Sequence, residues 1–236
     1  MRRETQNILL VLLGGALLKI SLTGTYLRYV KPSHQWLLIT GGLVMILLAV
    51  VSIVRELRGA RDDDGHGHTH SARSAWLLVL PVLAVFLIGP PPLGADSVAR
   101  ASGNTTPSTE GAGSELFPKL PAGDPIALPL SDFSARAAWD SGHSLDNRKA
   151  RLVGFVVHEG KDTYVARLAI ACCAADAFPI KIKLLGKELS NLPNDSWIEV
   201  DATLRPGSAT RANEYVPSVT THSVREILAP EDPYEH

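Results

Sequence analysis

The most constraining feature of this sequence is an uncharged apolar run, WLLITGGLVMILLAVVSIV, from Trp36 to Val54. A helix that crosses the hydrocarbon core of a bilayer needs about 20 mainly apolar residues, and this run satisfies that length by itself. Two further apolar stretches flank it, from Asn7 to Val30 and from Ala75 to Gly94. The sequence therefore predicts an α-helical membrane region over residues 1–94, with two to three spans near 7–30, 36–54 and 75–93.

The first stretch carries a charge, Lys19, within its apolar run. Burying a charge in lipid is expensive, so an intramembrane charge is by default functional. A lysine can also keep its apolar stem in lipid while its ammonium group reaches toward the interface. Both interpretations stay open, and the structural one is favoured.

The basic residues of the short loops predict the orientation, because such loops stay on the cytoplasmic side. Arg2 and Arg3 precede the first stretch. The loop between the second and third stretches contains Arg55, Arg58, Arg61 and Arg73. With three crossings the C-terminal part lies outside the cytoplasm, and with two it lies inside. We expect a multi-pass protein of the cell membrane with an extracytoplasmic C-terminal domain.

The same loop is rich in histidine. It reads RDDDGHGHTHSAR and alternates His66, His68 and His70. Imidazole suits Zn, Cu and Ni, and short His-rich tracts gather metal ions. The interleaved glycines give such a tract no preformed geometry. The segment is therefore either a weak metal-gathering tract or a solvated polar loop.

Residues 95–130 are rich in Gly, Pro, Ser, Thr and Ala, which predicts a flexible linker. Residues 131–236 form the predicted soluble β domain, beginning with a short helix in SDFSARAAWDSG. Apolar, β-branched runs then predict five strands, within 150–160, 163–173, 178–186, 196–207 and 215–228. The fold class is thus a helical membrane region followed by a small, mostly-β domain, for which an OB-like five-stranded barrel is the first choice.

Composition excludes several function classes. The chain has 23 Lys and Arg against 24 Asp and Glu, a formal net charge of −1, so it lacks the basic surplus that nucleic-acid binding needs. Its β segment also has few aromatic side chains on which bases could stack. No P-loop, dinucleotide fingerprint or Ser-His-Asp arrangement is present. We expect a protein that is not an enzyme and does not bind nucleic acid.

Both cysteines of the chain lie side by side in AIACCAADAFP, as Cys172 and Cys173, followed by Asp176. Two thiolates and a carboxylate make a partial shell for Zn or Cu(I), with His158 or His222 as a fourth ligand. Adjacent cysteines can close only a strained disulfide ring, which makes a redox role less favourable.

A structural interpretation of the same motif also stays open. Free cysteine behaves as a small, buried apolar residue, and an aspartate commonly accepts hydrogen bonds from nearby backbone. In that case Arg167 is expected to form an ion pair with Asp176 and order the turn.

GFVVHEG, YVARLAIACCAADAFPI, DSWIEVDATL and the tail with YVPSV and PEDPYEH resemble the YcgQ-type family of bacterial membrane proteins. The motif R-x-x-I-x-C-C-x-A-D-A comprises Arg167, Ile170, Cys172, Cys173, Ala175, Asp176 and Ala177. This resemblance implies a subunit of a two-component permease in the lipid membrane, with a larger polytopic permease subunit as its partner.

We therefore expect a non-enzymatic integral membrane subunit whose extracytoplasmic β domain assists or gates transport by that partner. The alternative is a membrane protein that binds or delivers Zn or Cu. It would use Cys172, Cys173 and Asp176 together with His66, His68 and His70.

Overall fold

The computed structural model describes residues 3–58, 83, 87, 90–101, 117–186 and 189–236. The chain divides into two compact units, Met1–Pro91 and Pro92–His236. The histidine tract at 66–70 lies outside the described residues. Most of the predicted third span over 75–93 also lies outside the described residues, so the third span stays a prediction.

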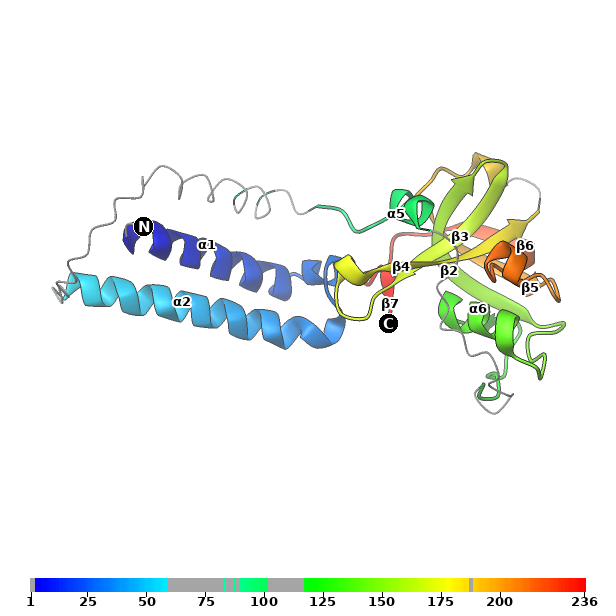
Figure 1. The fold of residues 1–236 in the computed structure, drawn as a ribbon, viewed down its shortest axis with the longest axis horizontal. Coiled ribbons are helices and arrows are strands. Elements are labelled where there is room, and N and C mark those ends of the chain that lie inside the picture. Colours follow the sequence, from blue (N-terminus) through cyan, green and yellow to red (C-terminus); the bar gives the residue numbers. More distant parts are fainter. Residues whose placement is uncertain (1–2, 59–82, 84–86, 88–89, 102–116, 187–188) are drawn as a thin grey trace. The chain divides into compact units, whose positions relative to one another are not determined.

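The first unit contains an antiparallel pair of helices, α1 (Arg3–Leu22) and α2 (Gln35–Leu57) (Figure 1). Two 3-10 turns, η1 (Thr25–Arg28) and η2 (Pro32–His34), join them. Gly24 precedes η1 with a φ of 76°, in the left-handed region that glycine enters without steric cost. The chain reverses direction there.

The predicted first span over 7–30 is wrong at its end, because α1 stops at Leu22. The hydroxyl and the N–H of Thr23 both donate to the carbonyl of Lys19, at 2.9 and 3.0 Å. Lys19 itself lies in the last turn of α1, where a cation complements the helix dipole.

One described helix, Pro32–Arg55, is long and apolar enough to cross a membrane, and the apolar part of α1, Gln6–Leu22, is shorter. Only 11% of the apolar part of the longer helix is buried. A core helix of a soluble unit would bury at least one full face. Large exposed apolar side chains along α2 are Trp36, Leu37, Leu43, Val44, Leu47, Leu48, Val50 and Val51.

Glycines set the contact between α1 and α2. A Cβ added at Gly14 would lie 2.9 Å from the carbonyl oxygen of Gly42, and one at Gly42 would lie 3.0 Å from that of Gly14. Only glycine permits this approach of two helix backbones, an arrangement common between membrane helices.

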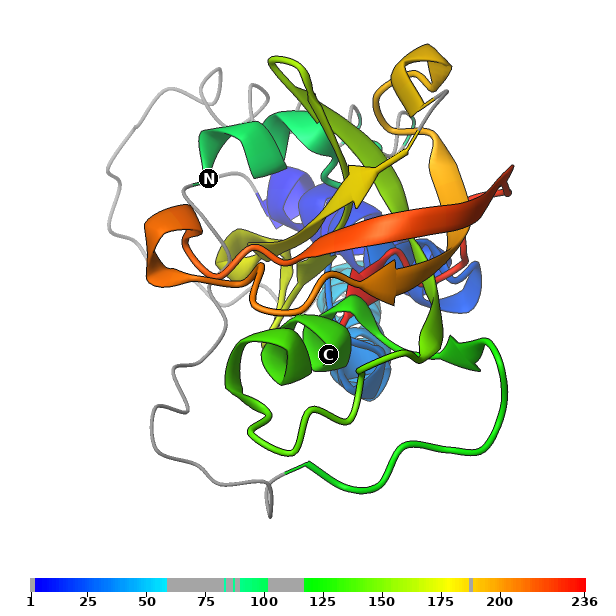
Figure 2. The same cartoon turned by 90° about the vertical axis from the view of Figure 1, so that its right-hand side faces the viewer.

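The second unit is built on one seven-stranded sheet (Figure 2). The strands are β1 (Ile126–Ala127), β2 (Lys149–Glu159), β3 (Asp162–Ala169), β4 (Phe178–Leu185), β5 (Trp197–Leu204), β6 (Ser218–Glu226) and β7 (Tyr234–Glu235). Their order is β1-β2-β5-β6-β4-β3-β7, with β2 also pairing with β3. The five long strands thus pair in a closed cycle in which β4 and β6 are parallel and the other four pairs antiparallel.

Strand β2 closes the cycle because it pairs with two neighbours. Residues 149–155 pair with β5, and residues 155–159 pair with β3. At Gly154, next to this change of partner, an added Cβ would collide with the carbonyl oxygen of Ala166 and lie 2.8 Å from a methyl carbon of Val165. The absence of a side chain at Gly154 lets β3 approach.

Two helices cover the sheet, α5 (Ala95–Arg100) and α6 (Leu130–Trp139). The main core lies between the strands and α6, and its fully buried side chains include Leu130, Phe133, Leu152, Ile182 and Ile198. A second core lies under α5 and contains Val98, Phe155, Val157, Leu168, Ile170 and Tyr234. Both cores alternate along the strands as the sequence pattern predicts.

The sequence predictions for this unit hold in their main elements. The five expected strands are present, and the helix expected from Ser131 is α6. The second expected strand, over 163–173, ends earlier, at Ala169, so the cysteines are not on a strand. Two further short 3-10 turns, η5 (Leu189–Asn191) and η6 (Arg211–Asn213), lie between strands.

The segment expected to be a flexible linker, 95–130, needs correction at both ends. Residues 95–100 form α5, which packs Val98 fully buried against the sheet. The N–H of Ala95 donates to the carboxylate of Asp195 at 2.6 Å. At the other end, β1 pairs in parallel with β2. Composition predicted a tether because it does not register long-range partners such as these.

Candidate metal centre

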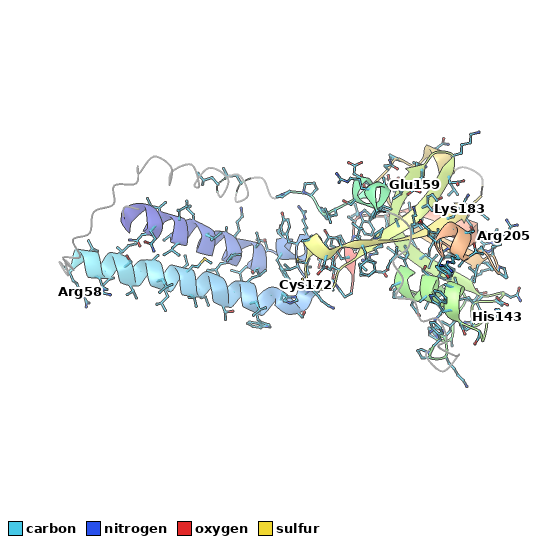
Figure 3. The ribbon with its side chains drawn as sticks, in the orientation of Figure 1. Arg58, His143, Glu159, Cys172, Lys183 and Arg205 are labelled. Carbon is cyan, nitrogen blue, oxygen red and sulfur yellow. The ribbon has the colours of Figure 1, made fainter. Side chains whose placement is uncertain are left out.

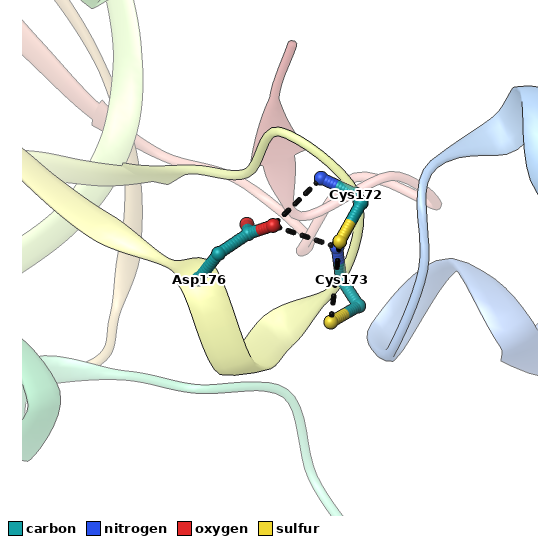
Figure 4. Close-up of side chains that lie close together, drawn as sticks. All are labelled: Cys172, Cys173 and Asp176. Atoms are coloured by element: carbon teal, nitrogen blue, oxygen red, sulfur yellow. Dashed lines mark hydrogen bonds between the residues drawn. The ribbon is translucent and has the colours of Figure 1, made fainter.

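The loop after β3 brings the two cysteines and Asp176 together (Figure 4). It leaves β3 at Ala169, makes one 3-10 turn, η4 (Ala174–Asp176), and returns as β4. The ligand atoms of Cys172, Cys173 and Asp176 all lie within 4.8 Å of one another, and the two Sγ atoms are 3.6 Å apart. Both cysteines are free thiols.

The carboxylate of Asp176 organises this loop. Its Oδ1 accepts the N–H of Ala171 at 2.9 Å, and its Oδ2 accepts the N–H groups of Cys172 at 2.8 Å and Cys173 at 3.4 Å. The thiol of Cys172 and these backbone donors lower the pKa of Asp176 to about 2, against a smaller opposing effect of burial. The predicted bonding of Asp176 to nearby backbone is therefore present.

The same carboxylate acts on the thiol of Cys172. Its hydrogen bond to Asp176, followed by that to Cys173, raises the pKa of Cys172 to about 12. A thiol with that pKa carries its proton at neutral pH. An incoming metal ion therefore has to displace a proton from sulfur, as metal binding to thiols generally does.

The cluster is open to solvent. Cys172 and Asp176 are exposed and Cys173 is partly exposed, although Ile170, two residues before Cys172, is buried in the core under α5. The expectation of two buried, small apolar cysteines is therefore wrong. Exposed thiols suit ligand capture better than core packing.

Arg167 does not pair with Asp176, so that prediction is wrong. Its guanidinium donates to the carbonyl oxygens of Asp232 at 2.7 Å and of Pro233 and Tyr234 at 3.4 Å, and it lies 5.5 Å from the ring centre of Trp197. Burial lowers its pKa, against the opposing charges of Glu235 and Asp232. Arg167 fastens the C-terminal segment to the sheet.

The two histidines considered as a fourth ligand are engaged elsewhere. His158 contacts the carbonyl of Leu192 at 2.6 Å and the hydroxyl of Thr163 at 3.1 Å. His222 contacts the hydroxyl of Thr203 at 2.7 Å. Within the described part of the chain, no other group of three or more candidate ligands comes together.

Sequence reasoning missed the residues that brace the start of this loop. The N–H of Ile170 donates to the backbone carbonyl of Glu235 at 2.9 Å. The buried carboxylate of Glu235 accepts the N–H groups of Leu130 and Ser131 at 2.7 and 2.8 Å, at the N-terminus of α6. The only sequence signal was the tail PEDPYEH, which ends in the short strand β7. Figure 3 labels Cys172 among the side chains of the described residues.

Two protein-family models match this chain. Residues 5–104 match the DUF1980 N-terminal domain, and residues 142–236 match the DUF1980 C-terminal domain. No curated protein matches the chain.

Among solved structures, a chain described as an aspartyl-tRNA synthetase from Leishmania major Friedlin aligns with 8% identity and a TM-score of 0.27. The alignment covers 45% of this chain and 21% of that one, a likeness that is too weak to carry an argument. The two family matches together span most of the sequence and confirm the resemblance carried by the Cys-Cys motif: the chain belongs to the DUF1980 family.

Proposed function

We propose that this chain is a membrane-anchored metal-binding subunit whose β domain captures a thiophilic ion at Cys172, Cys173 and Asp176. One observation carries the proposal: three donor atoms within 4.8 Å of one another on a loop open to solvent. Thiolate sulfur and carboxylate oxygen are ligands of Zn, and thiolate sulfur also selects Cu(I).

Preorganisation supports this proposal. The hydrogen bonds that three successive backbone N–H groups donate to Asp176 fold the loop before any ion arrives. The entropy of ordering the two thiols is therefore largely lost on folding and does not weaken binding. The binding step exchanges thiol protons for the ion, and no bond of a substrate is made or broken.

The anchoring part of the proposal rests on the first unit. We infer that α2 crosses the membrane, because its apolar surface is exposed along its length. The glycine contact with α1 supports a multi-pass arrangement in lipid. The excess of arginine near the N-terminus and in the second loop favours a cytoplasmic position for both, and the β domain is then extracytoplasmic if the stretch over 75–93 also crosses.

The β domain itself is, on this proposal, an OB-like barrel. Its closed cycle of five strands, with one parallel pair between β4 and β6, supports that fold. In such a barrel the Cys172–Asp176 loop joins the second and third strands.

Retention of metal by the full chain in detergent micelles tests the proposal. After exposure to Zn²⁺ or to reduced copper and removal of free ion, we expect one ion per chain for the unaltered protein. The Cys172→Ser/Cys173→Ser variant is expected to retain none at that site. Asp146→Asn, an exposed aspartate far from the loop in sequence, is the matched control for Asp176→Asn. Equal retention by all four proteins would refute the proposed site.

A second proposal concerns the partner. The exposed apolar side chains of α2 leave a surface that α1 does not cover, and a larger polytopic permease subunit is an occupant of suitable chemistry. A photo-crosslinking side chain at Leu47, which is 61% exposed, is expected to capture one membrane protein. Leu228, exposed on the β domain, is the background control. Crosslinks from Leu47 to lipid alone would argue against a permanent partner.

A further inference from the structure

We infer that the cluster holds a divalent ion of the Zn²⁺ class in a tetrahedral shell, with three ligands from this chain and the fourth position open to a ligand from outside. This inference rests on the proposed function and names the ion and the way in which it is exchanged.

The distance between the two sulfur atoms distinguishes a tetrahedral ion from a linear one. Zn–S bonds of about 2.3 Å in a tetrahedral shell place two sulfurs about 3.8 Å apart. A two-coordinate Cu(I) ion held in a straight line by bonds of that length would need about 4.6 Å. The Sγ atoms of Cys172 and Cys173 are 3.6 Å apart, close to the tetrahedral value. An ion of the zinc class therefore fits with almost no movement of the thiols.

The loop resists opening to the linear arrangement. Cys172 and Cys173 both donate their N–H groups to one carboxylate oxygen of Asp176, so their backbones are tied to one point. Moving the sulfurs about 1 Å further apart would require new side-chain rotamers or the loss of these hydrogen bonds. The folded loop thus favours the tetrahedral ion.

The third ligand is one oxygen of Asp176. A carboxylate offers about four lone-pair sites, and three of them accept the N–H groups of Ala171, Cys172 and Cys173. The remaining site lies on Oδ1, which accepts only the N–H of Ala171, and this site can coordinate the ion. A ligand set of two sulfurs and one oxygen suits zinc better than Cu(I), because oxygen is a hard ligand.

No fourth ligand comes from the described residues. The rings of His158 and His222 are hydrogen-bonded at other places in the sheet. The fourth position faces solvent, since Cys172 and Asp176 are exposed. Structural zinc sites are closed by four protein ligands, whereas sites that exchange a ligand keep one position open. This site is therefore one of loading and transfer, in which an imidazole or thiolate from a carrier or membrane partner completes the shell.

Cobalt substitution tests the inference on the full chain in detergent, under reducing conditions. Co²⁺ replaces Zn²⁺ and reports its geometry and sulfur ligands by absorption. We expect one Co²⁺ per chain, tetrahedral d–d bands and a sulfur-to-cobalt charge-transfer band that needs both cysteines. Adding imidazole is expected to shift the d–d bands. A His66→Ala/His68→Ala/His70→Ala variant is expected to give the same spectra as the unaltered chain.

The other possible results of this experiment separately contradict the open fourth position, the tetrahedral ion and the metal-binding function. Tetrahedral bands that imidazole leaves unchanged, or that the histidine variant alters, would refute the open position but leave the metal site standing. Retention of Cu(I) without Zn²⁺ or Co²⁺ would refute the tetrahedral ion, while the proposed metal-binding function would survive. If no ion is retained, the proposed function fails and this inference fails with it.

Discussion

The carboxylate of Asp176 accepts the backbone N–H of Cys172 at 2.8 Å, four residues earlier in the chain. The same carboxylate interacts with the thiol of that cysteine. One side chain therefore folds the loop and also holds the proton on the sulfur. Asp176 thus links the local structure of the loop to the reactivity of its thiol.

Replacing Asp176 by Asn is expected to increase the reactivity of Cys172. The hydrogen bond to the Asp176 carboxylate, and to a lesser extent its negative charge, disfavour the thiolate, so replacing the carboxylate lowers the pKa of Cys172 from about 12. Each unit of that fall raises the thiolate fraction roughly tenfold. The reactivity of Cys172 is measured in a Cys173→Ser background, by the rate of alkylation with iodoacetamide at about pH 8 followed by mass spectrometry. Asp146→Asn is the control, and an unchanged alkylation rate in Asp176→Asn would contradict the assignment.

The pKa of Asp176 predicts a pH dependence of the loop. Folding lowers this pKa to about 2 from an ordinary value of about 3.9. The carboxylate therefore contributes stability above about pH 4, and that contribution is lost as the pH falls through about 2. Selective ¹⁵N labelling of cysteine gives two amide signals, because the chain has 2 cysteines. Both should titrate near pH 2, and neither should do so in Asp176→Asn.

Replacing Gly154 by Ala is expected to destabilise the β domain. The new methyl group would meet the carbonyl of Ala166 and the side chain of Val165, and such overpacking typically costs about 1–3 kcal/mol. Gly160→Ala is the comparison. A Cβ at Gly160 would meet nothing within 4 Å, so the destabilisation there comes only from its backbone φ of 62°. Thermal unfolding of the full chain measures both. A melting temperature unchanged by Gly154→Ala would show that the strands are not this close.

Replacing Glu235 by Gln is expected to loosen the N-terminus of α6. The buried carboxylate accepts two backbone N–H groups there, and loss of its charge near a helix N-terminus should cost about 1 kcal/mol. Glu231→Gln, at an exposed position, should change stability by less than about 0.5 kcal/mol. Denaturant unfolding distinguishes them, and equal effects would refute a role for Glu235.

Two adjacent glycines give a matched test of the helical pair. A side chain at Gly14 would meet Gly42, Met45 and Ile46 within 3.1 Å, whereas one at Gly15 would meet nothing within 4 Å. Gly14→Leu should therefore separate α1 from α2, at a cost of about 1–3 kcal/mol, and Gly15→Leu should not. Protease resistance of the pair in detergent is the measurement. Similar resistance of the two variants would place the helix contact elsewhere.

The sequence predicted local features well, because apolar periodicity directly reports which face of a strand is buried. Ile180, Ile182 and Leu184 alternate on β4 and are buried as expected. The proximity of Asp176 to the cysteines also follows from their short spacing in one loop.

The errors concern contacts between segments distant in sequence. Arg167 has three of its partners about 65 residues away, on a tail that adds a parallel strand. Val98 was assigned to a linker because its composition gives no sign of the sheet that buries it. The sequence predicts a first helix that ends too late, because apolar residues continue past the turn at Gly24.

The double pairing of β2 has a consequence for behaviour at high concentration. An unpaired strand edge is a template on which another chain can add a strand and begin to aggregate. Because β2 pairs with both β3 and β5, none of the five long strands has an open side along its full length, and the sheet order ends in β1 and β7, of 2 residues each. The edge that another copy could extend is therefore confined to parts of strands, chiefly β6 beyond Thr220, where its pairing with β4 has ended.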